Sequence, residues 1–127
     1  MVIKTRSGRV ITDKYESVED AVKAGVNLAR ADLGGADLEN ADLTGAKLRD
    51  AYLAGATLDG ANLTRANLTR ANLRGADLVE ANLTDAILLL ANLNDADLSR
   101  ATFTNAVLTS VNISGAYIQL GNEIFRL

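Results

Sequence analysis

The residues of this chain that could take part in acid–base or metal chemistry are mostly carboxylates. The sequence holds 16 Asp and Glu but no His and no Cys. The absence of His excludes Ser–His and Cys–His catalysis and the commonest proton shuttle, and the absence of Cys excludes disulfides and thiolate metal sites. The carboxylates recur at intervals, as Asp37 and Asp77 do, whereas general acid–base chemistry needs a desolvated pocket. We therefore expect no catalytic residues, no metal site and no cofactor, and we predict that the protein is not an enzyme.

The charge balance gives little indication of a charged partner. The formal net charge is −3, from 16 acidic and 13 basic residues, and no polybasic run indicates nucleic acid or an anionic membrane. No apolar run is long enough to span a bilayer, and Met1 to Arg6 lack the apolar core of a signal peptide. We expect a cytoplasmic protein that binds neither nucleic acid nor membranes.

A five-residue repeat positions almost all of these side chains. From Asn27 onward the chain contains about nineteen tandem copies of A-(D/N)-L-x-x. Leu occupies every fifth position from Leu28 to Leu108, with Phe103 as the exception, and Ala lies two residues before most of them. Neither a helix nor an ordinary strand gives a period of five. With aromatics at only 4% of the chain, the pattern predicts a narrow core of Leu and Ala.

This pattern resembles the pentapeptide-repeat family over roughly Val26 to Leu120. The resemblance implies an all-β fold, a right-handed quadrilateral parallel β-helix, in which four repeats form one coil of twenty residues. The central Leu or Phe and the small residue two before it would then point inward. Nineteen repeats would make nearly five coils. The residues agree, because the two positions that hardly vary are apolar and the three that vary are polar or Gly, as a surface with tight turns requires.

The two ends fall outside the repeat, and they divide the chain into three parts. Residues 1–25 are predicted to form an N-terminal cap, with a hairpin around Ser7-Gly8 and a short helix that begins after Ser17 and ends at Gly25. Residues 26–120 are predicted to form the β-helix, and 121–127 a C-terminal cap or tail. Two alternatives remain for this tail, since an open coil end is an unpaired sheet edge: it folds over the last coil, or it forms a dimer contact. The protein would accordingly be a monomer or a homodimer through a coil end. The residues concerned are Ile124, Phe125 and Leu127.

A coil of twenty residues sorts the outward side chains into four faces. We call the face that follows Leu28, Leu48, Leu68, Leu88 and Leu108 the patch face, because apolar side chains replace the expected polar ones there. An apolar patch rimmed by polar residues indicates a contact surface. The alternative is that an end of the chain folds back over it. The residues of this contact patch are Ile87, Leu89, Leu90 and Val107. Arg30, Arg49 and Arg70 lie on the same face, toward the N-terminus.

A second face, the acidic face, follows Leu38, Leu58, Leu78, Leu98 and Ile118. Its carboxylates, opposed by a single Arg100, are Asp37, Glu39, Asp59, Asp77, Glu80 and Asp97. One interpretation is a site for a basic partner, or a mimic of the DNA phosphate backbone, as the family resemblance implies for members that bind DNA gyrase. The other is that Asp before Leu serves solubility and turn formation. The remaining two faces carry a column of Thr and a set of Gly residues, and we call them the threonine face and the glycine face.

Three hypotheses about function follow. The first is a non-enzymatic solenoid that serves as a protein-binding or structural scaffold for an unidentified protein partner. The alternative is a DNA-mimicking inhibitor or protector of a topoisomerase such as DNA gyrase. The third is a structural domain of a longer chain whose activity lies elsewhere. The sequence favours the first, because the contact patch departs most clearly from the repeat.

Overall fold

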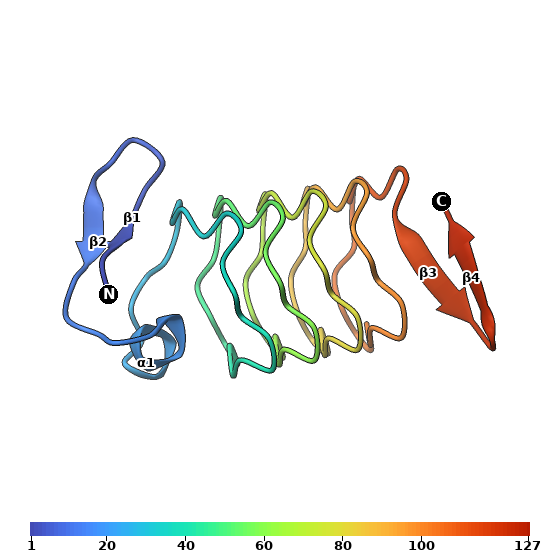
Figure 1. The fold of residues 1–127 in the computed structure, drawn as a ribbon, viewed down its shortest axis with the longest axis horizontal. Coiled ribbons are helices and arrows are strands. Elements are labelled where there is room, and N and C mark those ends of the chain that lie inside the picture. Colours follow the sequence, from blue (N-terminus) through green and yellow to red (C-terminus); the bar gives the residue numbers. More distant parts are fainter.

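The chain forms an elongated column of stacked coils with a two-stranded hairpin at each end (Figure 1). A computed structural model describes residues 1–127, the whole chain. The first hairpin pairs β1 (Ile3–Lys4) with β2 (Val10–Thr12), and α1 (Val18–Lys23) follows it. The second hairpin pairs β3 (Tyr117–Leu120) with β4 (Glu123–Arg126). The column between them is built from isolated β-bridges.

The coils repeat every twenty residues, because the bridges between them join residues twenty apart. Parallel bridges join Asn27 to Lys47, Lys47 to Asn67, and so on to Asp97 and Tyr117. Of the 79 backbone hydrogen bonds, 70 lie outside the named helix and strands. The ladder between coils therefore holds most of the backbone polar groups, as a buried backbone requires.

A tight turn closes each five-residue unit and explains the two variable positions after Leu. The N–H of the following Ala donates to the carbonyl of the Leu three residues earlier, as from Ala71 to Leu68 at 2.9 Å. The residue before that Ala has a positive φ, which is the property of a type II turn and favours Gly. Gly35 and Gly75 occupy it, with φ of 64° and 63°. Elsewhere Arg, Asn, Asp, Glu, Ser and once Leu are held in the same conformation.

The preference for Asp or Asn before Leu also has a local cause. At all twelve repeat positions where Asp or Asn precedes the central residue, its side-chain oxygen accepts from the N–H two residues later. Asn72, for example, accepts from Arg74 at 3.1 Å. This bond satisfies an amide that the ladder leaves free. Most Asp residues of the repeat therefore have a structural role in the backbone.

The core is a column of Leu and Ala side chains inside the coils. Every central Leu from Leu28 to Leu98 is buried, and from Leu33 onward so is the Ala two residues before each, except Ala36. The last central residues line the inside of the column but are not enclosed, since Leu108 and Ile113 are 46% and 40% exposed. The physical reason is that no further coil stacks on them. They line an open hollow of about 230 Å³, together with Leu93, Leu98, Phe103, Val111, Ile118 and Leu127.

The N-terminal end of the column is covered. The backbone carbonyl of Lys4 accepts from the N–H of Asp32 at 2.7 Å, and Thr5 forms an antiparallel bridge with Ala31. Ile3, Val18 and Ala21 are buried in the same apolar cluster as the coil Leu residues. The hairpin and α1 therefore pair the edge and cover the core at this end, as a solenoid cap must do.

The short helix α1 has the ends that its sequence indicates. Ser17 is its N-cap and accepts from the N–H of Asp20 at 3.1 Å, and Gly25 follows its C-cap with φ 75°. With six residues it is far too short to cross a bilayer, and the structure contains no other helix.

Candidate protein-contact surface

The four residues of the contact patch lie together on the outside of the last two coils of the patch face. Ile87 and Val107 form a parallel bridge, so their side chains are neighbours on one surface. Both are exposed, Leu90 is 53% exposed, and Leu89 is half-buried. No end of the chain lies over these side chains, since both hairpins lie at the ends of the column (Figure 1). The structure thus brings together the apolar residues that the sequence singled out.

The requirements of the fold do not explain this patch. Ile87 and Val107 occupy the position where Asp or Asn would accept from the amide two residues later, and neither has an oxygen to do so. Leu90 has φ 59° in the turn, where a branched apolar residue is unfavourable and Gly or Asn is preferred. Three of the four residues therefore occupy positions where polar residues or Gly would fold better.

The N-terminal part of the patch face is cationic. Arg49 Nε and Arg70 Nε lie 3.5 Å and 3.0 Å from the carboxylate of Asp50. Two hollows of about 340 and 500 Å³ flank Arg9 and Arg30, and Asp50 is the one carboxylate in the lining of either. We call this set the cationic cluster. Its members are Arg6, Arg9, Arg30, Lys47, Arg49 and Arg70.

The first hairpin supplies two members of the cationic cluster that the sequence analysis missed. The loop between β1 and β2 places Arg6 over the ring of Tyr52, 4.1 Å from its centre, and places Arg9 beside Arg30 in the lining of both hollows. The repeat register assigns residues 27–120 to faces, but it does not state over which face the hairpin lies. The only sequence feature that could have indicated this placement is the presence of two Arg residues, Arg6 and Arg9, in the short loop.

The carboxylates of the acidic face are largely used by the fold. Asp37, Asp77 and Asp97 accept from backbone amides at 3.2, 3.1 and 2.9 Å. Glu80 pairs with Arg100 at 2.7 Å. Glu39 accepts from the side-chain amide of its neighbour at 3.4 Å, and Asp59 makes no side-chain hydrogen bond or ion pair. These contacts favour the interpretation that Asp before Leu serves turn formation.

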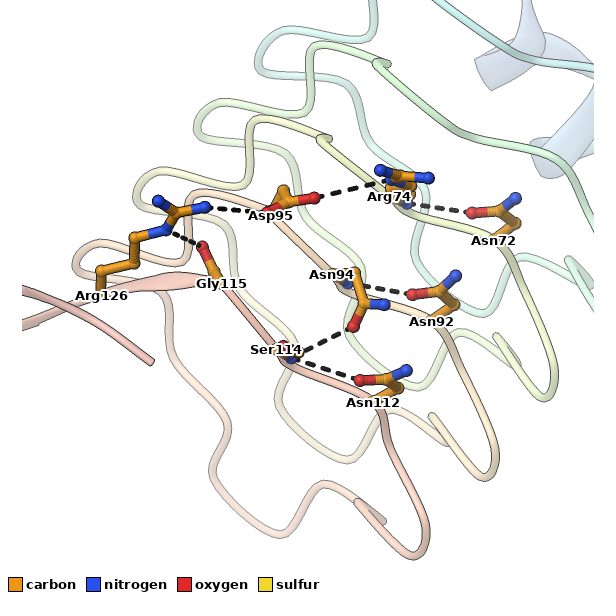
Figure 2. A network of polar contacts seen from close by, with 9 residues as sticks. All are labelled: Asn72, Arg74, Asn92, Asn94, Asp95, Asn112, Ser114, Gly115 and Arg126. Atoms are coloured by element: carbon orange, nitrogen blue, oxygen red, sulfur yellow. Dashed lines mark hydrogen bonds and ion pairs between the residues drawn. The ribbon is translucent and has the colours of Figure 1, made fainter.

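The C-terminal residues form the outer strand of the second hairpin. Phe125 pairs with Ile118, and Ile124 and Phe125 are exposed, while Leu127 lines the open hollow. Arg126 ties this hairpin to the coils: Nη2 lies 3.3 Å from Asp95, and Nε donates to the carbonyl of Gly115 at 3.3 Å. Figure 2 shows this contact continuing to Arg74, 3.6 Å from the other oxygen of Asp95. Beside it the backbone amide of Ser114 contacts the side-chain oxygens of Asn94 and Asn112.

Two features of the acidic side chains bear on metal binding and proton transfer: how closely they cluster and whether a pKa is shifted. No group of three or more carboxylates lies close enough to hold a metal ion. One carboxyl has a perturbed pKa: the hydroxyl and the amide of Thr44 both donate to Asp42 and hold its pKa below the ordinary value. A carboxylate on the outer wall with a lowered pKa is a poor proton carrier near neutral pH.

Comparison with known proteins agrees with this architecture. The sequence matches the family description "Pentapeptide repeats (8 copies)" over residues 24–60, 46–85 and 86–119. The structure is similar to that of a pentapeptide repeat protein from the thylakoid lumen of Arabidopsis thaliana, with TM-score 0.76 and 31% identity. That similarity covers 85% of this chain and 77% of the other.

Two other similar structures have lower TM-scores. HetL, a pentapeptide repeat protein involved in heterocyst differentiation regulation in the cyanobacterium Nostoc sp. strain PCC 7120, is 43% identical with TM-score 0.47, over 68% of this chain and 40% of its own. QnrB1, a plasmid-mediated fluoroquinolone resistance protein, is 23% identical with TM-score 0.44, over 67% of this chain and 49% of its own. No curated protein matches the sequence.

Proposed function

The chain belongs to the pentapeptide-repeat family, and on that basis we propose that it is a non-enzymatic scaffold that binds another protein through the contact patch. In this proposal the coils form a rigid column and the patch provides the apolar centre of the interface. Buried apolar side chains with a polar surround are the usual composition of such an interface. The partner is a protein, and neither a cofactor nor a membrane takes part.

One observation carries the proposal: the contact patch is exposed, although Asp, Asn or Gly at three of its positions would stabilise the turns better. Thr69 and Ser110 show which residues the neighbouring coils use at the positions of Leu89 and Leu90. A patch of exposed aliphatic side chains lowers solubility and favours association. Apolar residues at Ile87, Leu90 and Val107 are accounted for when a second molecule covers them.

The shape of the scaffold is part of the proposal. We propose a right-handed, four-sided column of nearly five coils. The twenty-residue spacing of the bridges and a turn at every fifth residue support four sides. The right hand is supported by the strong preference of parallel β-crossovers for that hand. A crystal structure with a left-handed coil or a different number of sides would contradict it.

Affinity capture from cells that make the protein, with proteins identified by mass spectrometry, tests the proposed interface. The test variant is Leu89→Asp with Leu90→Asp, and the matched control is Thr64→Asp with Arg65→Asp, the same positions of the repeat on the threonine face. We expect a protein captured by the wild type and the control to be missing from the test variant. An unchanged set with the test variant would exclude the contact patch as the interface.

The alternative is a DNA-mimicking inhibitor or protector of a topoisomerase such as DNA gyrase. The acidic face favours it, because four of its carboxylates are exposed on one side of the column: Asp37, Glu39, Asp77 and Glu80. The overall charge of −3 and the cationic cluster on the patch face weigh against it. A supercoiling assay distinguishes the two, because a scaffold that binds through the contact patch has no effect on supercoiling even at high excess.

A further inference from the structure

We propose that the partner binds the patch face with an extended acidic segment that lies along the column. The carboxylates of this segment contact the cationic cluster, and its apolar side chains contact the contact patch. This inference rests on the proposed function, which it deepens by naming the chemistry of the partner. The inference depends on the arrangement of the whole patch face, which has the cationic cluster toward the N-terminus and the contact patch toward the C-terminus.

The charge of the cationic cluster is opposite to that of the whole chain. The chain is acidic overall, with a formal charge of −3, yet the cationic cluster holds six Arg and Lys against one Asp. Asp50 already pairs with Arg49 and Arg70. Arg6, Arg9 and Arg30 form no ion pair, although their side chains surround the two hollows. The guanidinium group binds carboxylates with two parallel hydrogen bonds, so three unpaired Arg residues at one place favour an acidic ligand.

The hollows are also chemically suited to carboxylates. Thr5 and Ser7 line the smaller one, with their hydroxyls 2.8 Å apart, and Arg6 is held over the ring of Tyr52. A stacked guanidinium loses less freedom on binding than a free one. The site therefore offers hydroxyl and guanidinium donors, part of them already oriented.

The order of residues along the patch face indicates how such a segment would lie. Arg30, Asp50, Arg70 and Leu90 occupy the same position of four successive coils, so this line is charged in the first three coils and apolar in the fourth. The step between parallel coils is about 4.8 Å, so the coil of Arg30 lies about 14 Å from that of Leu90. An extended segment spans this distance with about four or five residues. A partner segment that reaches both sites therefore needs an acidic residue four or five positions away from an apolar one.

A nucleic acid fits this face less well than a protein segment. Single strands are held by a basic groove together with aromatic side chains on which bases stack. The contact patch consists of aliphatic residues only, and Tyr52 is already covered by Arg6. The aliphatic half of the face favours Leu, Ile, Val or Phe side chains of a protein.

Selection from a phage-displayed library of random twelve-residue peptides on the full chain tests the inference. We expect selected peptides to contain two or more Asp or Glu four or five residues from an aliphatic or Phe residue. A fluorescent copy of one selected peptide, measured by anisotropy, should bind at least ~10-fold more weakly to Arg9→Glu with Arg30→Glu, since charge reversal at a close ion pair removes that much or more. Arg65→Glu, on the threonine face, is the matched control and should leave affinity unchanged.

The outcomes separate this inference from the proposed function. Selected peptides without acidic residues, whose binding is lost in Leu89→Asp with Leu90→Asp but unaffected by Arg9→Glu with Arg30→Glu, would overturn the inference and leave the proposed function standing. Acidic peptides insensitive to the changes at Leu89 and Leu90 would overturn the inference, because the contact patch would then take no part in binding the acidic segment, while affinity capture still decides the proposed function. No selected peptide family, or a twenty-nucleotide DNA strand bound more tightly than any selected peptide, would also overturn the inference.

Discussion

Replacing one Leu of the core with Ala should destabilise the column by an amount that depends on how many coils cover it. Leu68 is 0% exposed, and Leu48 and Leu88, its counterparts in the coils on either side, are also fully buried. Leu68→Ala removes three carbon atoms from a site held by coils on both sides, so the cavity cannot readily collapse. We expect a loss of about 2–5 kcal/mol in the free energy of unfolding.

Leu108 is the matched position, because it is the central residue of the same face two coils later. It is 46% exposed at the open hollow. Leu108→Ala therefore removes only about half as much buried apolar surface and creates no enclosed cavity. We expect it to lower the free energy of unfolding by about 1 kcal/mol. Thr69→Ala, on the surface beside Leu68, should change stability by about 0.5 kcal/mol or less.

Urea unfolding followed by circular dichroism measures the three variants against the wild type. With a slope of about 2 kcal/mol per molar urea, the midpoint should fall by about 1–2.5 M for Leu68→Ala and by about 0.5 M for Leu108→Ala. The order of the effects is the essential result. Equal losses for Leu68 and Leu108, or a large loss for Thr69, would refute the assignment of inward and outward positions and the open C-terminal end.

Three further outcomes are expected. Asn72→Ala removes the acceptor of a backbone amide and should lower the free energy of unfolding by about 0.5–1.5 kcal/mol in urea; no loss would mean that water replaces this bond fully. Thr44→Val should raise the pKa of Asp42 toward its ordinary value, because the Thr44 hydroxyl is the largest cause of the lowering, and NMR titration of the carboxyl carbon measures it. Since that pKa is lowered in the folded state, the stability it contributes is present above the ordinary pKa of Asp and is lost as the pH falls through the folded value; a Thr44→Val variant with an unchanged pKa contradicts this cause. Arg126→Ala removes the contact to Asp95 and should speed amide hydrogen exchange in β3 and β4 without changing global stability, because an exposed ion pair contributes about 1 kcal/mol or less; unchanged exchange would show that Arg126 does not hold the hairpin.

The sequence predicted the middle of the molecule well because the constraint there is periodic. One side chain in five must fill the core, so the inward positions from Leu28 to Leu98 follow from spacing alone. The exposure of Ile87 and Leu90 followed from the same count. The family assignment needed no more than this repeat.

The ends could not be predicted in the same way, because their placement depends on packing between parts that share no period. The repeat did not indicate that the first hairpin places Arg6 and Arg9 beside Arg30. It indicated that Leu108 and Ile113 point inward, but not that they are partly exposed, because enclosure also requires a further coil and the chain instead continues into a hairpin along one edge. For this reason the repeat placed Arg30, Arg49 and Arg70 on the patch face but gave no position for the two Arg residues of the hairpin.

The central claim is that a partner protein covers the contact patch, and site-specific photo-crosslinking in cells that make the protein tests it most directly. A photoreactive benzoylphenylalanine replaces Leu89 in one variant and Thr64, at the same repeat position on the threonine face, in the other. We expect a discrete protein adduct after irradiation from position 89 and none from position 64. No adduct from position 89, or the same adduct from both positions, would contradict it.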